Sequence, residues 1–479
     1  MREKKIIATG VKWVGGLEII SRVAYILILL ILAKIISPAE YGIFAFLMIF
    51  FRFTQAFGDF GLTAALIQKE TIQSKHYYSS FWLIESITVL FAGITYLSRG
   101  IIGELFNMNS IETFYGAMII PFIVFPYSLI PKAILNRELN FKVLALVDFT
   151  AIMINLMTTL ILALLNFSVW AFIIGLYMEI LVANIMLWKA TKWIPRFLIS
   201  FAAIKDLFGY STHVFITRLF NFANLNIVPL LVSKFYGAAA LGIYSITFQI
   251  VDFPVQRISK NIMKVLFPVL SKLQKDHDKF FEIFIKTVGV VLYVLIIVYA
   301  LIYAGVQQVV IHFLWEKWHG VQEILAIMIG VGAIRAYWIF FSAVFLSKGK
   351  PQKEWQLHII LAGTFLLILA GMINNISGIS GFLSIWLMAW LVALGWGHLF
   401  IFPMLGCTVA IYFQSIRRSI VYGFMVFIIF MVKYFWPWST TSLFQGILDV
   451  VITAMIILMV FILVDRKKIS SIKELLVNK

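Results

Sequence analysis

Four arginines stand inside long apolar stretches of this chain: Arg22, Arg52, Arg218 and Arg335. A charged side chain at bilayer depth costs about 3 kcal/mol on insertion scales, so such a residue must face a wet cavity, a partner or an anionic ligand. The planar guanidinium group binds two phosphate oxygens at once. These arginines therefore indicate an anion-binding site within a membrane-embedded protein.

The composition also indicates a membrane protein. Of the 479 residues, 62% are hydrophobic and 13% are charged, and the mean hydropathy is +0.98, whereas soluble domains are roughly 25% charged. The net charge of +17 is expected where cytoplasmic loops are rich in Lys and Arg, and we expect no nucleic-acid partner. The histidines show no metal-ligand spacing and no phosphate-binding loop motif is found, so we expect no metal and no cofactor.

The apolar stretches predict an all-α integral membrane protein. Stretches of ~20 residues, long enough to cross the hydrocarbon core, recur along the chain and predict about fourteen transmembrane helices. The expected spans are 12–36, 41–67, 79–98, 113–135, 143–165, 168–190, 209–234, 240–266, 283–306, 322–346, 355–373, 379–403, 418–436 and 444–464. The loops between them are too short to form a soluble domain that could hold an active site.

Lys and Arg are concentrated in alternate connections between the expected spans, including the terminal segments 1–12 and 465–479. Loops rich in these residues face the cytoplasm in membrane proteins. We therefore expect a multi-pass protein of the cytoplasmic membrane with both termini in the cytoplasm.

A weak internal repeat relates the two halves of the chain. A displacement of 200 residues places Gly42 on Gly242 without gaps, and further identities are Lys34 on Lys234, Ile43 on Ile243 and Phe53 on Phe253. The repeat predicts two pseudo-symmetric six-helix lobes, residues 1–200 and 201–405, around a central cationic cavity. Residues 406–479 would then add two C-terminal helices and a cytoplasmic tail.

Polar residues in the first, second, seventh and eighth expected spans follow the periodicity of a helix. In the second span, for example, Arg52, Gln55 and Asp59 share one face. A polar stripe inside a span must face protein or water rather than lipid. We predict that the following residues line the cavity and bind the ligand: Arg22, Arg52, Arg218, Asn221, Arg257, Lys260 and Arg335.

The same arginines have a structural alternative. Arg22 could pair with Glu18 one turn away, and Arg52 could pair with Asp148 or Glu179 of a neighbouring helix. In either case the charge would be satisfied within the protein and no ligand would be needed.

Carboxylates inside the expected spans are either such partners or groups that couple transport to protons or cations. We place the ion coupling at Glu18, Asp59 and Asp252. In the fourth span, Pro121, Pro126 and Pro131 indicate a bend or a gating element.

Several segments resemble the bacterial polysaccharide flippases of the Wzx type, which export lipopolysaccharide and exopolysaccharide precursors. They include "FGDFGLTAALIQKETIQSKHYYSSFW" in residues 57–82, "AILNRELNFKVLALVD" in residues 133–148 and "VWAFIIGLYMEIL" in residues 169–181. The resemblance implies membership of the multidrug/oligosaccharidyl-lipid/polysaccharide exporter superfamily, which implies two lobes and alternating access. The chain is also similar to the lipid II flippases of that superfamily, which carry arginines in helices one, two and eight; Arg22, Arg52 and Arg257 match them.

The resemblance implies a polyprenyl-pyrophosphate-linked oligosaccharide as cargo, moved across the cytoplasmic membrane for O-antigen, capsule or exopolysaccharide biosynthesis. The lipid bilayer and a polysaccharide polymerase machinery are the further partners it suggests. We therefore expect a transporter and not an enzyme. The alternatives are a cation-coupled multidrug antiporter of the same superfamily and a membrane polysaccharide polymerase.

Overall fold

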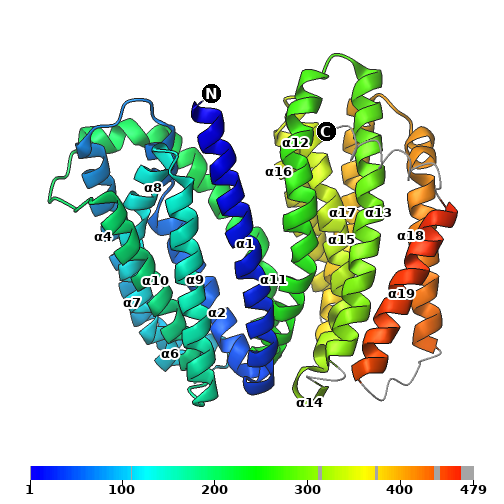
Figure 1. Cartoon of the computed structure of the whole chain (residues 1–479), viewed down its shortest axis with the longest axis horizontal. Coiled ribbons are helices and arrows are strands. Elements are labelled where there is room, and N and C mark those ends of the chain that lie inside the picture. Colours follow the sequence, from blue (N-terminus) through cyan, green and yellow to red (C-terminus); the bar gives the residue numbers. More distant parts are fainter. Residues whose placement is uncertain (1, 109–110, 311–314, 373–375, 436–442, 465–479) are drawn as a thin grey trace. The chain divides into compact units, whose positions relative to one another are not determined.

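The computed structural model describes residues 2–108, 111–310, 315–372, 376–435 and 443–464. Every regular element within these ranges is helical. The chain forms two compact units, Met1–Ser245 and Ile246–Lys479 (Figure 1), which are described separately below. The predicted all-α class is confirmed, whereas the lobe boundaries taken from the repeat stay predictions.

Unit 1 is built around the helix α9, which packs along α10 on one side and α1 on the other. Buried residues such as Leu135, Val147 and Leu187 form a core between α8, α9 and α10. The helices of this unit are α1 (Arg2–Ile35), α2 (Pro38–Gly58), α3 (Leu62–Gln68), α4 (Ser74–Leu97), α5 (Arg99–Leu105), α6 (Ile111–Ala117), α7 (Ile119–Val124), η1 (Phe125–Ser128), α8 (Leu129–Arg137), α9 (Phe141–Leu164), α10 (Val169–Thr191) and most of α11 (Phe201–Pro254).

Unit 2 is built around α13 and α15, which pack on one another. The C-terminal helices α18 and α19 pack against α13, where Tyr293, Tyr422 and Phe461 are buried together. The helices of this unit are η2 (Val255–Ser259, a π-helix), α12 (Lys260–Lys272), α13 (His277–Val309), α14 (Trp315–Trp318), α15 (Gly320–Ser347), α16 (Gln352–Met372), α17 (Gly378–Leu405), α18 (Val409–Phe435) and α19 (Leu443–Val464).

The described residues contain 11 helices that are long and apolar enough to cross a membrane, fewer than the about fourteen spans expected from apolar length. One candidate, Phe222–Lys272, covers two expected spans. Gly237, with φ 79° and ψ −173°, breaks the helical backbone between those two spans. The last two expected spans correspond to α18 and to α19, whose apolar part Leu448–Ile462 is short.

Polar residues and a glycine determine where α2 begins and ends. Ser37 and Glu40 form a capping box, in which the Glu40 carboxylate accepts the Ser37 backbone N–H at 2.7 Å. At the other end, Asp59 follows the last helical residue. Gly61 has a φ of 74°, a backbone conformation that would be strained in any residue with a side chain. The second expected span is therefore divided into α2 and α3, with Asp59 at the break.

The region of Pro121, Pro126 and Pro131, where we expect a bend or a gating element, is divided into α7, the 3-10 helix η1 and α8. A proline lacks the N–H that would bind the carbonyl one turn earlier. Side chains of α10 replace two of these donors: the Tyr177 hydroxyl donates to the carbonyl of Ala117, and the Trp188 indole to that of Tyr127 at 3.0 Å. The Asn184 amide also donates to the carbonyl of Val124, at 3.0 Å.

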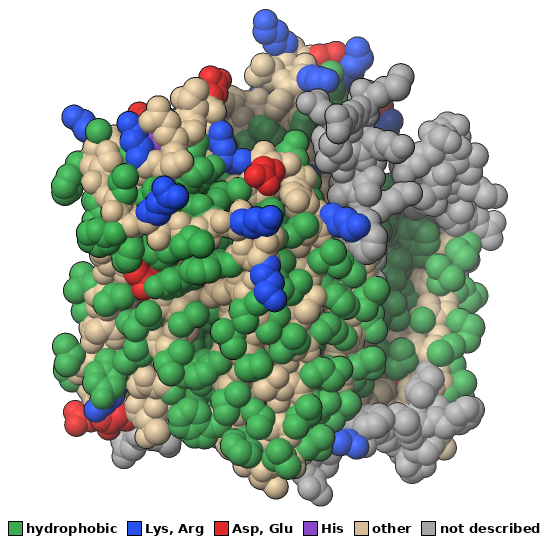
Figure 2. Space-filling model, turned by 60° about the vertical axis from the view of Figure 1, so that its left-hand side comes forward, with side chains coloured by type: hydrophobic (Ala, Val, Ile, Leu, Met, Phe, Trp, Pro, Cys, Tyr) green, Lys and Arg blue, Asp and Glu red, His purple; other side chains and the backbone are tan. Residues whose placement is uncertain are grey.

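The outward surface fits a lipid environment. Figure 2 shows hydrophobic side chains over most of the face in view, with Lys and Arg gathered mainly toward its upper end. Large apolar residues on the span helices are open to the surroundings, among them Leu97 at 81% and Leu367 at 76% exposure. Such residues would be costly in water and are favourable against lipid chains.

Candidate functional site

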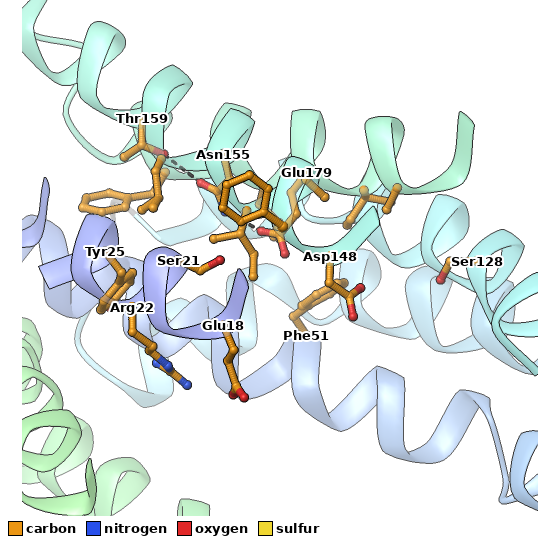
Figure 3. A pocket seen from close by; sticks show the side chains of 18 of the residues that line it. Glu18, Ser21, Arg22, Tyr25, Phe51, Ser128, Asp148, Asn155, Thr159 and Glu179 are labelled. Carbon is orange, nitrogen blue, oxygen red and sulfur yellow. Dashed lines mark hydrogen bonds between the residues drawn. The ribbon is translucent and has the colours of Figure 1, made fainter. Parts of the chain in front are cut away.

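The polar stripe of α1 lines a cavity of about 690 Å³ inside unit 1 (Figure 3). Its walls come from α1, α2, η1, α8, α9 and α10. Although the helices are mostly apolar, many of the lining residues are polar: Glu18, Ser21, Arg22, Tyr25, Tyr41, Gln55, Ser128, Lys132, Asp148, Asn155, Thr159 and Glu179. The cavity is therefore suited to water, ions or a polar headgroup.

The α1 wall carries the first predicted site residues. Glu18, Arg22 and Tyr25 share one face of the helix, and Figure 3 shows Glu18 and Arg22 extending in the same direction from it. The α2 residue Arg52 is exposed, and its neighbours Phe51 and Gln55 line the cavity. Arg22 thus lines the cavity itself, and Arg52 lies beside residues that line it.

The opposite wall of the cavity carries two acidic side chains, Asp148 and Glu179, and each of them is paired with another residue of that wall. The Asn155 amide donates to the Glu179 carboxylate, and Thr159 donates its hydroxyl to Asn155 Oδ1 at 3.0 Å (Figure 3). Lys132 Nζ lies 3.0 Å from Asp148 Oδ1. The pairings of Arg52 with Asp148 or Glu179, considered above as a structural alternative, are therefore not needed to satisfy these carboxylates.

Arg218 and Asp59 form an ion pair within unit 1. The Asp59 side chain is 4% exposed, and its Oδ1 also accepts the backbone N–H of Thr63 at 3.0 Å, which caps α3. Around the pair, the rings of Phe60 and Phe215 stack at 4.2 Å. A predicted ligand residue and a predicted coupling residue therefore neutralise one another in this conformation.

A second pair of the same kind lies in unit 2. Arg335 Nη1 is 2.9 Å from Asp252 Oδ1, and the two side chains are only 14% and 16% exposed. The guanidinium group also lies over the ring of Phe248, 4.8 Å from its centroid. Asp252 accepts a further bond from the Gln256 amide at 2.8 Å. Arg335 thus has two kinds of contact, an ion pair with Asp252 and a cation–π contact with Phe248.

The remaining predicted ligand residues lie elsewhere. Arg257 stands on the π-helix η2 and is half-buried, and Lys260 at the start of α12 is exposed. The side chain of Asn221 lies outside the described residues. Within the described ranges, no group of three or more His, Cys, Asp or Glu residues is arranged to hold a metal ion.

Comparisons with known proteins identify the family. Residues 31–323 match the family model described as "Polysaccharide biosynthesis protein". The chain is 23% identical over 435 residues to the teichuronic acid biosynthesis protein TuaB of Bacillus subtilis, with 86% of each protein covered. It is 21% identical over 394 residues to the lipopolysaccharide biosynthesis protein WzxC of Escherichia coli, covering 80% of this chain and 79% of that protein.

Solved structures show the fold. The lipid II flippase MurJ in its inward closed conformation superposes with a TM-score of 0.70 at 15% identity, covering 94% of this chain and 100% of that one. An inward-facing multidrug resistance transporter of the MATE family gives a TM-score of 0.57 at 13% identity, covering 78% of this chain and 94% of that one. The fold is therefore that of the MurJ and MATE proteins, as the sequence resemblance implied.

The chain is a multi-pass membrane protein of a transporter fold, and it is not an enzyme, so the polymerase alternative was wrong. The region that matches the polysaccharide biosynthesis family, residues 31–323, covers more than half of the sequence and includes every predicted site residue from Arg52 to Lys260. The chain belongs to the family of polysaccharide biosynthesis proteins that includes membrane transporters of polysaccharide precursors.

Proposed function

We propose that this protein flips a polyprenyl-pyrophosphate-linked oligosaccharide across the cytoplasmic membrane by alternating access, for the synthesis of O-antigen, capsule or exopolysaccharide. The observation that carries the proposal is the polar cavity of unit 1, which Arg22 lines and beside which Arg52 stands between the lining residues Phe51 and Gln55. The names of the relatives, which refer to teichuronic acid and lipopolysaccharide biosynthesis, support a polysaccharide precursor as the cargo.

A pyrophosphate fits these two arginines chemically. Each of its phosphates carries an ionised oxygen, and a guanidinium group binds such oxygens through two parallel hydrogen bonds. A cavity whose dielectric constant is lower than that of bulk water strengthens such contacts, which then offset part of the cost of desolvating the headgroup. The sugar would occupy the polar cavity while the polyprenyl chain stays in lipid.

The two ion pairs suggest how ligand binding and ion coupling are connected. Arg218 is held by Asp59, and Arg335 is held by Asp252. A phosphate that competes for either arginine would release its carboxylate, which could then take up a proton or a cation. Arg218, Asn221, Arg257, Lys260 and Arg335 are therefore proposed as ligand residues in other steps of the cycle, with Glu18, Asp59 and Asp252 as coupling groups.

The proposed orientation places both termini in the cytoplasm, as the distribution of Lys and Arg predicts. The ligand would then enter from the cytoplasmic leaflet, where lipid-linked sugars are assembled, and leave toward a polymerase machinery on the other side. Cysteine labelling at the two chain ends in intact cells measures this orientation directly.

The function is tested with Arg22→Ala and Arg52→Ala in a strain lacking the chromosomal gene. Each substitution removes one phosphate-binding fork, so we expect polymer export to fall by about tenfold or more and undecaprenyl-linked glycan to accumulate. The Lys variants should recover only part of the export, because an ammonium cannot form the bidentate contact. Arg99→Ala is the matched control, since Arg99 pairs with Glu112 and lies away from the cavity.

Normal export by both alanine variants at wild-type protein levels would refute the pyrophosphate site. The multidrug antiporter remains the second candidate, because the MATE fold likeness and the acidic wall of the cavity also suit a cationic drug. Efflux of a cationic dye by the purified, reconstituted protein, with no accumulation of lipid-linked glycan on gene deletion, would favour that candidate.

A further inference from the structure

One buried carboxyl group of unit 1 has no role in the proposed ligand site. Glu85 lies near the middle of α4, and its side chain is 8% exposed. Its Oε2 atom is buried without a hydrogen-bonding partner, and among the described residues it belongs to no ion pair. An ionised carboxylate at this position would have a buried oxygen without a hydrogen-bond donor and would have no counter-charge, which is costly.

The nearest part of the core is apolar. Phe81, one turn earlier on α4, and Ile84 beside Glu85 are fully buried in a cluster with Leu62 and Ile130. Thr88, one turn later, does not compensate the carboxyl group, because its hydroxyl donates to the Ile84 carbonyl at 2.7 Å.

Charged groups on the neighbouring elements are already engaged or exposed. The helix α4 packs mainly against α2, α7 and η1, and also touches α3, α5, α6 and α8. From η1, the Tyr127 phenol is a titratable group that interacts electrostatically with Glu85. Three ion pairs involve the other elements: Asp59 with Arg218, Arg99 with Glu112, and Lys132 with Asp148. Glu40 is hydrogen-bonded to Ser37 and Ser168, and Arg137 donates to the carbonyls of Leu66 and Glu70. The remaining charged groups, Arg52 and Glu104, are exposed.

We propose that Glu85 carries a proton at neutral pH and that its carboxyl group is a proton-binding site of unit 1. The neutral acid requires no counter-charge, so α4 tolerates it at this depth. A rearrangement that admits water between α4 and the segment formed by α7 and η1 would let the acid release its proton to that water. Proton binding would therefore favour the packed arrangement over the hydrated one.

Infrared spectroscopy of the full-length protein in lipid nanodiscs tests the site without any transport measurement. A protonated carboxyl group and an ionised carboxylate absorb at different frequencies. We expect wild-type protein at neutral pH to show a protonated-carboxyl band that Glu85→Gln removes. The control is Glu282→Gln, which removes an exposed carboxylate paired with Lys286 and should leave the band unchanged.

Thermal unfolding of the same samples provides the second measurement. Glu85→Gln replaces the acid with a neutral group of the same shape, so its melting temperature should match wild type in acid, below the unfolded-state glutamate pKa of about 4.3. Raising the pH from there to neutral should lower the melting temperature of wild type by several degrees more than that of Glu85→Gln, because the unfolded wild-type chain ionises Glu85 whereas the folded protein keeps it protonated. An unchanged infrared band in Glu85→Gln, or equal pH dependence of the two proteins, would overturn the proposal. Neither result depends on the identity of the transported ligand, so the proton site and the proposed function are tested separately.

Discussion

At the scale of single residues, the polar stripes of the sequence predict which charged residues lie inside spans, whereas the structure shows which of them are in contact. The stripes placed Arg218 and Asp59 inside spans, but they lie 159 positions apart, and helix periodicity does not say which groups meet. The structure joins them, and it joins Arg335 to Asp252 in the same way. Removing Arg218 would leave Asp59, whose side chain is 4% exposed, as a buried charge without its partner.

A third acidic residue shows how a surface carboxylate can tie one segment to another. Asp206, in the first turns of α11 and outside the candidate spans, lies 2.8 Å from Lys69 Nζ and 3.2 Å from His76 Nε2. Hydrogen bonds from Lys69 and His76 lower the pKa of Asp206 below its ordinary value. The ionised form is therefore more favourable in the folded protein than in the unfolded chain.

We expect Asp206→Asn to lower the melting temperature by a few degrees at neutral pH and by less in acid. The contribution of a depressed carboxyl pKa is complete above the unfolded-state value of about 3.9 and disappears as the pH falls through the folded-state value. Melting curves of wild type and variant in detergent between neutral and acidic pH measure the difference. Glu104→Gln, which changes an exposed carboxylate, is the control; a constant difference down to strongly acidic pH would contradict the prediction.

At the scale of elements, the sequence predicted the helices better than the contacts between them. Apolar length located the spans, and the break at Gly237 falls in the expected gap between residues 234 and 240. The prolines predicted the interruption within residues 113–135, because each removes a backbone donor. The compensating donors could not be predicted, since Tyr177, Asn184 and Trp188 lie about sixty positions away in sequence and only the packing of α10 brings them close.

The same limit applies to the cavity of unit 1. Glu179 is one of several carboxylates within the expected spans, and its sequence neighbours do not distinguish it from the others. Gly175, one turn earlier on α10, is the signal that sequence offers in retrospect. A Cβ there would overlap the side chains of Thr159 and Asn155, so a glycine is needed for α9 and α10 to approach closely enough to bond Asn155 to Glu179.

We expect Tyr177→Phe to destabilise unit 1 by roughly 0.6–2 kcal/mol, the range for hydrogen bonds within membrane proteins and for carbonyls left without a donor. The substitution keeps the ring and leaves the carbonyl of Ala117 without its donor from α10. The midpoint of thermal unfolding of the purified protein measures the effect. Tyr210→Phe, at a tyrosine that is 45% exposed, should leave the midpoint unchanged, and an equal effect of both substitutions would contradict the role of the α10 donors.

At the scale of the whole molecule, one contact within unit 1 supports the repeat. Gly42 and Gly242, which the displacement of 200 residues aligns, lie against one another: a Cβ at Gly42 would overlap the carbonyl of Ala238, and a Cβ at Gly242 would overlap that of Pro38. Pro38 and Ala238 are themselves aligned by the same displacement. In each segment the glycine faces the carbonyl of the residue that lies four positions before the aligned glycine of the other segment. Such reciprocal contacts are expected around a two-fold axis.

Because the contact is reciprocal, Gly42→Ala and Gly242→Ala should have similar effects. Each added methyl group would force the two segments apart, at a cost of about 1–3 kcal/mol typical of overpacking, and would lower both the melting temperature and the export activity. The double variant should lose less than the two single losses together, because the first substitution already separates the backbones. Gly93→Ala is the control, since nothing lies within 4 Å of a Cβ at that helical glycine. A loss confined to one of the two single variants would mean that these aligned glycines do not form a symmetric contact, and the support they give to the repeat would be withdrawn.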